Sequence, residues 1–443
     1  MGASFGVGDL TGVFTHVQEH QNKEILKLWM QDVDPALAVF ETNSDTEGDG
    51  SGFKTRVEYG TGTSVNPNFA IAQAQAQGTD LGNQVDRAVW ISHASKLDAV
   101  AVWDRDSMLA AVKDGPAAAI DVVASERAGK IQLVRDRLAL FAVEKGWGRI
   151  STVVACTTGN LYFTVDKSEL HRFRRGDKLV FGATESSGAL RGADGTGAYV
   201  GWGNPWIVTG VQPATGRVLL LARGSDHPFD TDSVTTGDTV FLCGYRQNTA
   251  LPVKVCPIGL AGWVPSAVPT ETSFENIDRR NNPELYGYQF DASVGSMSHF
   301  DAFIESALTA ANWGCFIDQY LVSNTDYALM ARDKDRTKVI SMKVGPYQAG
   351  FEGLSVTGGR GEIKIVPSRF VPQGIAWGGP FKDKKFGPKL KHNGQLVNVD
   401  DIDGKPFMRL ASSTGFEQRL YFRGAQIVPG PGKYNVIYNL PSS

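Results

Sequence analysis

Two segments in the last third of the chain alternate apolar and polar residues and are punctuated by glycine and proline. They are residues 350–377, GFEGLSVTGGRGEIKIVPSRFVPQGIAW, and residues 416–437, FEQRLYFRGAQIVPGPGKYNVI. Because successive side chains of a strand point to opposite faces, this alternation predicts β-structure with one buried face. Neither segment carries the residue types of an active site. We therefore expect this part of the chain to serve packing rather than chemistry.

Size and charge narrow the classes of protein that this chain can belong to. With 443 residues it can bury a large core and should hold more than one folded unit. Its 44 basic and 47 acidic residues leave a net charge of −3, which excludes binding to nucleic acid or an anionic membrane through bulk charge. Glycine contributes 50 residues, a share well above the usual ~7%, which indicates many turns and long loops.

The cysteines and the apolar stretches indicate a protein of a reducing compartment. Cys156, Cys243, Cys256 and Cys315 are widely spaced and form no CxxC pair, which argues against a disulfide framework. The chain does not open with a basic segment followed by an apolar run, and no stretch reaches the ~18 apolar residues of a membrane span. We expect a cytoplasmic product without a membrane partner.

A long hairpin arm is predicted in the first quarter of the chain. Residues 53–59, FKTRVEY, alternate with period two, and residues 85–103 are again apolar and β-prone. Between them, residues 60–82 are polar and include AQAQAQ at 72–77. A connection of about 25 residues without secondary structure would be unusual inside a compact domain. We therefore expect the two strands to leave the body of the protein and pack on something else.

The longest predicted helix covers residues 116–145. Gly115-Pro116 marks its start, because proline at the first helical position loses no needed N–H group, and Gly146 is a natural terminator. At 1.5 Å per residue it would be about 45 Å long. Its predicted buried stripe is Ile120, Val123, Ile131, Val134, Leu138 and Phe141. Its predicted solvent-facing residues are Lys130, Arg135, Arg137 and Glu144.

Two shorter helices are predicted on either side of it. In the first, Asp34-Pro35 marks the end, because proline disfavours the α conformation of the residue before it. The apolar residues of this helix are Leu10, Phe14, Val17, Ile25, Leu28 and Trp29. In the second, over residues 298–312, Ser298 and Asp301 fit a capping box. Its predicted core face is Phe300, Phe303, Ile304, Ala307, Leu308 and Ala311.

Residues 157–244 change to short strands and turns. The β-prone stretches are LYFTVD, DKLVFG, WIVTGV, RVLLLA and DTVFLCG, interrupted by a glycine-rich segment at 182–206. Short strands at close spacing favour a small β-barrel or sandwich, inserted into the rest of the chain. We expect this unit to fold independently and to lie on an outer surface.

One motif resembles a zinc site. His16, Glu19 and His20 match the HxxEH pattern of inverted zinc peptidases, with both histidines on one helix face. No preceding scaffold is expected to supply the outer hydrogen bonds that such sites need. Two polar histidines beside an amphipathic stripe are the preferred interpretation.

Two further motifs lack the context that their chemistry requires. Gly2 to Gly6 match GxSxG without the strand that must precede it. The calcium-like loop that begins at Asp45 has Arg56 at the position where a bidentate glutamate is needed. The glycines at 358–361 fit a tight turn between two strands. No catalytic, cofactor-binding or metal-binding residue is therefore assigned.

Two basic clusters could touch phosphates, although a charge run is usually a solvated face. The first is Arg172, Arg174, Arg175 and Lys178, and the second is Lys382, Lys384, Lys385, Lys389 and Lys391. For the second cluster, a weak and non-specific contact with DNA stays open. The tryptophans, by contrast, are interpreted as core or interface aromatics: Trp202, Trp206, Trp263 and Trp313.

The order of these elements resembles the major capsid proteins of tailed bacteriophages, which have the α+β Hong Kong 97-like fold. The co-linear set is the N-terminal helix, the hairpin with TRVEYGTGTSVNPNFAIAQAQAQ, the long helix, the inserted β unit, GLAGWVPSAVPTETSFENIDRRNNPELYG at 259–287, LVSNTDYALM at 321–330, and the two C-terminal segments. The resemblance covers most of the chain and is weakest over 157–244.

The resemblance implies a division into the parts of that family. They are an N-terminal arm at 1–52, an extended E-loop at 53–104, a P-domain with the spine helix at 105–156, an inserted β-rich domain at 157–245, an A-domain at 246–365, and C-terminal strands returning to the P- and A-domains at 366–443. It also implies a function without catalysis or cofactor. The chain would assemble through hexamers and pentamers into an icosahedral shell around double-stranded DNA.

The implied partners are further copies of the chain, a portal protein, packaged DNA through weak contacts and, as an option, a decoration or cement protein. A separate scaffold protein is expected, because only about nine residues precede the first predicted helix. The expected location is the virion capsid, after assembly in the bacterial cytoplasm. The alternatives are an encapsulin-type nanocompartment, which shares the fold but encloses enzymes, and a zinc hydrolase.

The family also has a branch whose shells are crosslinked covalently. In that branch a lysine of the E-loop attacks an asparagine of a neighbouring subunit, assisted by a buried glutamate. Here residues 60–85 contain no lysine, and Lys54 and Lys96 lie at the base of the predicted hairpin. We therefore expect a shell without covalent crosslinks.

Overall fold

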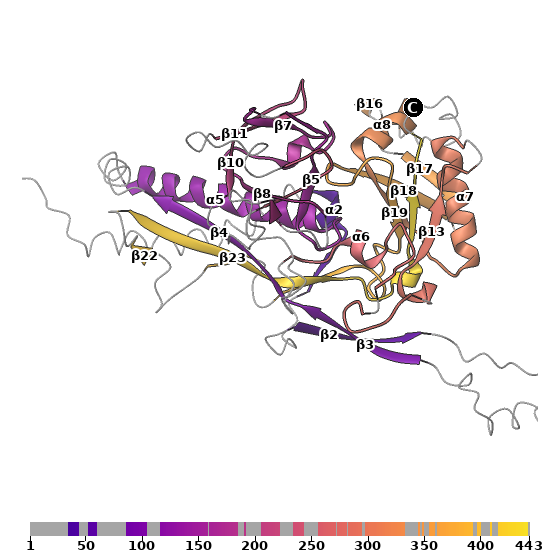
Figure 1. The fold of residues 1–443 in the computed structure, drawn as a ribbon. Coiled ribbons are helices and arrows are strands. Elements are labelled where there is room, and N and C mark those ends of the chain that lie inside the picture. The colour runs from indigo at the N-terminus through magenta and orange to yellow at the C-terminus, as the bar shows by residue number, and fades with distance from the viewer. Residues whose placement is uncertain are drawn as a thin grey trace, which may run out of the picture.

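The computed structural model describes residues 34–43, 52–59, 86–103, 116–157, 159–184, 190–191, 205–221, 234–242, 256–271, 273–280, 282–294, 297–332, 344–345, 348–349, 354–358, 361–392, 397–399, 408–409 and 415–441. Their strands form three large sheets and two two-stranded sheets, with helices packed against them (Figure 1). The fold is of the α+β class that the sequence predicts. The predicted helix that carries Leu10 and Trp29 lies outside the described residues.

The first large sheet, here called the ribbon sheet, is organised by the long strand β23 (Phe416–Ile427). β23 pairs antiparallel with β4 (Ser95–Trp103) along the whole of β4. The other strands of this sheet are β1 (Glu41–Asn43), β20 (Lys389–His392), β21 (Asn398–Val399) and β22 (Met408–Arg409). The long helix α5 (Pro116–Phe141) packs along β4 and β23 (Figure 1). Leu420 and Phe422 are buried, so the predicted alternation of this segment is confirmed.

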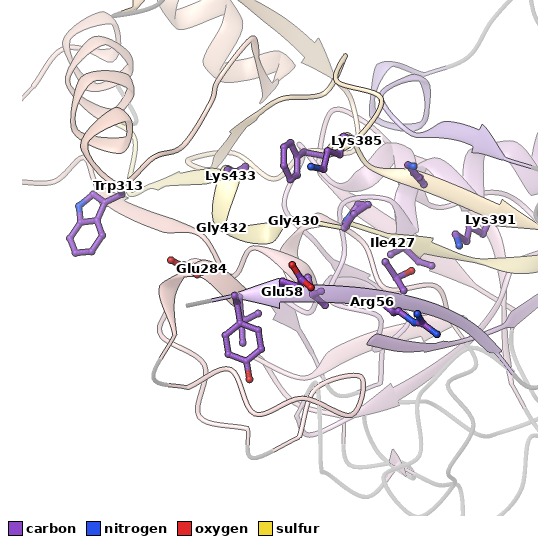
Figure 2. A pocket seen from close by; sticks show the side chains of 17 residues that line it. Arg56, Glu58, Glu284, Trp313, Lys385, Lys391, Ile427, Gly430, Gly432 and Lys433 are labelled. Atoms are coloured by element: carbon purple, nitrogen blue, oxygen red, sulfur yellow. The ribbon is translucent and has the colours of Figure 1, made fainter. Parts of the chain in front are cut away.

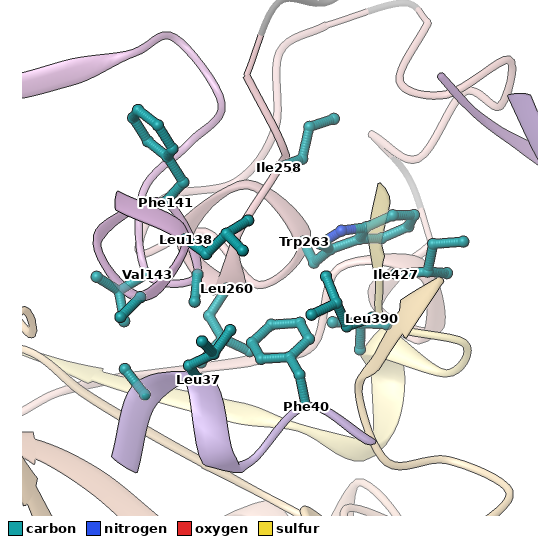
Figure 3. Close-up of a cluster of buried hydrophobic side chains, with 14 of the residues drawn as sticks. Leu37, Phe40, Leu138, Phe141, Val143, Ile258, Leu260, Trp263, Leu390 and Ile427 are labelled. Atoms are coloured by element: carbon teal, nitrogen blue, oxygen red, sulfur yellow. The ribbon is translucent and has the colours of Figure 1, made fainter. Parts of the chain in front are cut away.

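The buried stripe predicted for α5 is confirmed where the structure describes it. Ile131, Val134, Leu138 and Phe141 are buried. They belong to a core cluster that also contains Leu37, Phe40, Ile258, Leu260, Trp263, Leu390 and Ile427 (Figure 3). The short helix α6 (Leu260–Trp263) contributes two of these residues. The side chains of Ile120 and Val123 lie outside the described residues.

The prediction that four charged residues toward the end of α5 face solvent is wrong. Arg135, Arg137 and Glu144 are 5%, 8% and 5% exposed, and Lys130 is half-buried. The reason is that the barrel described next packs against this end of the helix and supplies ion-pair partners. A charged stripe on one helix does not reveal which part of the chain will cover it.

The second large sheet follows α5 and curls into a barrel. Its strands are β5 (Arg149–Thr152), β6 (Ala155–Cys156), β7 (Tyr162–Thr164), β8 (Lys178–Gly182), β9 (Leu190–Arg191), β10 (Trp206–Gln212), β11 (Arg217–Leu220) and β12 (Thr239–Leu242). The strand order β5-β12-β8-β10-β11-β7-β6 places the consecutive strands β5 and β6 at opposite ends. Val153 N donates to Asp238 O and Val154 N donates to Thr164 O, both at 2.8 Å, so this one segment joins the two ends.

The barrel has its own core, built around Phe163, Phe181 and Trp206. It also includes the 3-10 helix η1 (Leu170–Arg172). The sheet begins at Arg149, ahead of the boundary at residue 157 that the sequence suggests. The difference arises because β5 and β6 are too short to be recognised by alternation alone. That the unit folds alone and lies on an outer surface stays a prediction.

The third large sheet, here called the C-terminal sheet, has the order β13-β24-β19-β14-β18-β17. Its strands are β13 (Tyr288–Asp291), β14 (Gln319–Ser323), β17 (Leu354–Gly358), β18 (Gly361–Ser368), β19 (Ala376–Gly379) and β24 (Asn435–Tyr438). Helices α7 (His299–Asn312) and α8 (Asn324–Arg332) pack against it. The remaining short elements are η2 (Pro283–Leu285), η4 (Pro431–Lys433), β15 (Val344–Gly345) and β16 (Gln348–Ala349).

Most of what the sequence predicts for this sheet is confirmed. Gly358 pairs with Gly361 at the end of the β17–β18 hairpin, as expected for a tight turn. Ser298 Oγ accepts a hydrogen bond from Asp301 N at 3.2 Å, so it caps α7. One residue of the predicted core face of α7 is wrong, since Leu308 is 49% exposed.

Asp34-Pro35 begins a helix in the structure. The Asp34 side chain accepts from Ala36 N at 2.9 Å and caps the short helix α2 (Pro35–Ala38). Asp34 itself is extended, with φ −56° and ψ 136°, as the following proline requires. The dipeptide therefore stops any helix before it and starts a new one, and only the first half of this signal was predicted.

The predicted hairpin arm is present, but it is shorter than residues 53–104. β2 (Gly52–Tyr59) pairs antiparallel with β3 (Asp86–His93) in full register. β4 begins two residues later and belongs to the ribbon sheet instead. Ser95 Oγ donates to Gly424 O at 2.9 Å at this junction. The arm therefore ends at His93, because β23 offers β4 a longer partner.

Candidate functional site

The hairpin of β2 and β3, here called the arm, extends away from the body of the molecule (Figure 1). Its register runs from the pair Gly52 and His93 to the pair Tyr59 and Asp86. Within the described ranges, neither strand pairs with a further strand. Each therefore presents one long edge of backbone groups, and an isolated two-stranded ribbon is marginally stable in water. Such edges are available for pairing with a further strand.

The root of the arm is held by three aromatic rings, here called the aromatic anchor. Trp90 of β3 is fully buried, and its ring centroid lies 5.2 Å from that of Trp263 and 6.0 Å from that of Phe274. Trp263 and Phe274 lie 5.1 Å apart, and all three pairs meet edge to face, a favourable geometry. Neither Trp90 nor Phe274 is predicted from the sequence as a site residue. The sequence signal for Trp90 is its place in the apolar, β-prone stretch at residues 85–103.

A buried arginine fixes the loop that carries the anchor. The Arg279 guanidinium lies 3.5 Å from the centroid of Phe274 and donates to Gly262 O and Trp263 O at 2.8 and 3.3 Å. Burial lowers the pKa of Arg279, and Glu271, at 3.3 Å, acts in the opposite direction. The arrangement makes the support of the arm rigid.

The same loop also bonds to the arm backbone. Ile91 N donates to Glu275 O at 3.1 Å. Glu275 and Asn276 have positive φ angles of 47° and 74°, and Phe274 and Ile277 bond to each other across them. A glutamate in the left-handed region is uncommon, so this tight turn is held in place by its surroundings.

A groove of about 770 Å³ lies between the arm and the body, and it is here called the arm groove. Arg56 and Glu58 of β2 lie on one wall (Figure 2). Lys385, Lys391 and Lys433 lie on the other. The exposed Trp313 lies at one end (Figure 2), and the floor includes the buried Ile427. The groove therefore combines positive charge with apolar surface.

The lysine-rich loop on the body side is rigidly built. Asp318 accepts from the backbone amides of Phe381 and Lys382, both at 3.0 Å. Burial raises the pKa of Asp318, and these hydrogen bonds and the Lys382 charge limit the rise. Tyr434 donates its hydroxyl to Phe386 O at 2.8 Å. The loop thus presents its lysines on a fixed backbone.

The structure separates the five lysines predicted as one basic cluster. Lys385, Lys389 and Lys391 line the arm groove. Lys382 and Lys384 are exposed outside it. The hypothesis that the cluster contacts DNA stays a prediction.

The other predicted basic cluster holds the barrel to α5. Arg172 is 2% exposed, and its Nη1 lies 3.0 Å from Glu144 Oε1 and 3.1 Å from Glu169 Oε1. Its guanidinium also donates to Ile150 O at 2.7 Å and Phe370 O at 2.9 Å. The prediction that Arg172 could contact a phosphate is therefore wrong, since its guanidinium is buried and pairs with carboxylates of the same chain.

Further ion pairs extend this junction. Arg137 Nη2 lies 2.7 Å from Asp177 Oδ2. Asp136 pairs with Arg174 and, at 2.7 Å, with Arg369. Both of these pairs join α5 to other parts of the chain. Arg174, Arg175 and Lys178 are exposed, and of these three Arg174 is held by its ion pair with Asp136.

The three sequence motifs considered as metal or catalytic sites begin outside the part of the chain that the structure describes. His16, Glu19 and His20, Gly2 to Gly6, and Asp45 lie outside the described residues. Among those that are described, no group of three or more His, Cys, Asp or Glu could hold a metal ion. No described helix is long and apolar enough to cross a membrane.

The aromatic and thiol residues behave as follows. Trp206 and Trp263 are core residues, as predicted, whereas Trp313 is 62% exposed and stacks on Tyr288 with centroids 6.1 Å apart. Cys256 and Cys315 are buried thiols, and burial raises the pKa of Cys315 to about 11. A thiol with a raised pKa is a poor nucleophile. Trp202 and Cys243 lie outside the described residues.

Comparison with known proteins finds similarity in structure but not in sequence. No protein-family model matches the chain, and no curated protein matches it in sequence. The cyanophage A-1(L) capsid asymmetric unit is similar over 93% of this chain and 93% of that chain, with a TM-score of 0.50 and 9% identity.

Two other solved structures match at lower TM-scores. The capsid of an empty GTA particle matches 93% of this chain and 98% of that chain, with a TM-score of 0.44 and 8% identity. The holo-SrpI encapsulin complex from Synechococcus elongatus PCC 7942 matches 94% and 90%, with a TM-score of 0.43 and 9% identity. On the match to the cyanophage capsid, the predicted Hong Kong 97-like capsid fold is confirmed.

Proposed function

We propose that this protein is a major capsid protein, which assembles with copies of itself into a closed shell around phage double-stranded DNA. The observation that carries the proposal is the arm. Its strands β2 and β3 pair only with each other among the described strands, yet their root is fixed to the body by a buried aromatic anchor. A rigidly mounted strand pair with open edges serves contact with another subunit better than it serves a single chain.

The parts of the molecule follow from this assignment. The arm and residues 60–85 form the E-loop, α5 is the spine of the P-domain, and the C-terminal sheet with α7 and α8 belongs to the A-domain. The barrel is an insertion between spine and A-domain. A portal protein, a separate scaffold protein and a decoration protein are the further partners we propose, with assembly in the bacterial cytoplasm.

Deletion of residues 60–82 tests the role of the arm. The variant is expected to fold but to form no shells, because the reach of the hairpin is lost while its anchored root remains. Negative-stain microscopy and size-exclusion chromatography of wild type and variant measure the outcome. Normal shells from the deleted chain would contradict the assignment of the arm. Wild-type particles that contain protein cargo and no nucleic acid would favour an encapsulin-type compartment instead.

The absence of a suitable lysine predicts a shell without covalent crosslinks. Lys54 is exposed on β2, and Lys96 forms an ion pair with Asp98 at 3.2 Å on β4, so both lie at the root of the arm rather than near its tip. Mature particles boiled in denaturant should release a single band near 47.8 kDa on a gel. A ladder of multimers that survives reducing agent would overturn this prediction.

A further inference from the structure

The arm groove carries a local charge that differs from that of the whole chain. Its basic side chains are Arg56, Lys385, Lys389, Lys391 and Lys433, against the two carboxylates Glu58 and Glu284. Five positive and two negative charges leave the groove at +3, whereas the whole chain has a net charge of −3. The rest of the chain therefore carries −6, so a second copy brings a net negative charge to a contact with the groove.

The ammonium groups of three of these lysines lie in no direct contact with a described carboxylate, although backbone hydrogen bonds from Phe386 and Lys385 and the charge of Lys385 lower the pKa of the nearby Asp383. Among the described residues, no carboxylate forms an ion pair with Lys385, Lys389 or Lys433. Lys385 lies 5.2 Å from the centroid of Phe386, and Lys433 donates to Gly314 O at 3.2 Å. Lysines held near one another without carboxylate partners repel each other, and an acidic group placed among them is stabilised.

The groove also offers apolar surface that a purely charged ligand would leave unused. Val57 and Tyr59 of β2 line it together with Pro429, and Trp313 lies at its end with 62% of its surface exposed. Aromatic side chains next to charged groups are typical of protein interfaces. A peptide segment that carries both carboxylates and apolar side chains satisfies both kinds of surface, which the phosphate backbone of DNA does not.

We propose that the arm groove is the docking site for an acidic, partly apolar segment of a second copy of this chain, with its carboxylates on Lys385 and Lys389. This inference rests on the proposed function and names the contact that the groove makes in the shell. The open side of the groove then joins one subunit to the next, and the exposed face of Trp313 is covered on assembly.

Charge reversal in the full-length chain tests the proposal. The variant Lys385→Glu/Lys389→Glu is expected to fold as wild type does but to reduce the yield of shells by about tenfold or more, since like charges then face each other across the contact. The matched control is Lys167→Glu/Lys178→Glu, which makes the same change in net charge at two exposed lysines of the barrel. The control should assemble normally. Circular dichroism checks folding, and Lys385→Gln/Lys389→Gln, which adds no negative charge, serves if the reversed variant does not fold.

A second measurement identifies the occupant directly. Wild-type shells assembled from equal parts of unlabelled and ¹⁵N-labelled chain are treated with a carbodiimide, which joins amines to carboxylates in contact. Mass spectrometry should find Lys385 or Lys389 joined to an aspartate or glutamate of the other isotopic form. Such links identify the acidic segment.

The outcomes separate the inference from the proposed function. Wild type that forms neither shells nor the hexamers and pentamers that precede them overturns the proposed function and the inference together. Shells from both wild type and the reversed variant, or links only within one chain, overturn the inference alone. Normal shells of the reversed variant that hold less nucleic acid would assign the groove to DNA. If the control Lys167→Glu/Lys178→Glu also forms fewer shells, the loss comes from the change in net charge and not from the arm groove, and the inference is overturned.

Discussion

Replacing Trp90 with alanine is expected to abolish shell formation while the barrel stays folded. Trp90 is 0% exposed and contacts both Trp263 and Phe274 in the aromatic anchor. Truncating a buried tryptophan to alanine costs about 3–5 kcal/mol, which exceeds what a two-stranded ribbon can supply by itself. The arm should detach from the body. Negative-stain microscopy measures the shells, and hydrogen exchange at the Ile91 amide, which donates to Glu275 O, measures the detachment.

Trp90→Phe is the matched control. No hydrogen bond joins Trp90 Nε1 to any described residue. Phenylalanine therefore keeps an aromatic ring in the anchor, and the substitution breaks no hydrogen bond. We expect this variant to assemble and to retain protection at Ile91. If Trp90→Ala forms shells with the same yield as wild type, the result contradicts a structural role of the aromatic anchor. If the Val153 amide in the barrel also loses protection from hydrogen exchange, the alanine variant unfolds globally. That result would contradict a role of Trp90 that is confined to the arm.

Replacing Arg172 with alanine is expected to lower the free energy of unfolding by about 3–5 kcal/mol, because it removes the arginine from two buried ion pairs. Arg172 pairs with both Glu144 and Glu169, whose side chains are 7% and 11% exposed. It also bonds to Ile150 O and Phe370 O, so the change loosens the barrel from the rest of the protein. Denaturant unfolding followed by tryptophan fluorescence gives the difference from wild type.

A loss of less than about 1 kcal/mol from Arg172→Ala would count against a stabilising role of its buried ion pairs. Arg175→Ala is the control, because Arg175 is exposed, and its effect should stay within about 0.5 kcal/mol.

Local features of the fold could be predicted because each depends on neighbouring residues. Alternation along 53–59 and 416–427 predicts β2 and β23, and the apolar stripe from Ile131 to Phe141 predicts the buried face of α5. The cap at Ser298 follows from hydrogen bonds that lie within one turn of helix. The order of such elements along the chain also sufficed to predict the Hong Kong 97-like fold, which the match to a solved structure confirms.

The candidate site was harder to predict because its contacts join distant parts of the sequence. The lysine loop was noticed, but its position opposite the arm depends on how β20 and β23 pair. Trp90 belongs to the site only because Trp263 and Phe274 meet it in space. Alternation predicted a strand at β4, yet it could not tell that β4 would leave the arm for β23.

The sequence by itself determined the longer strands, the longer helices, the cap at Ser298 and the order of these elements, because periodicity and capping act over a few residues. The tertiary structure alone decided which charged residues are buried. Arg172 appears as one of four basic residues before a strand, and it becomes a core residue because Glu144 and Phe370 O, 28 and 198 positions away, converge on it. Burying a charge is unfavourable unless partners surround it, and where those partners lie is a property of the packed chain.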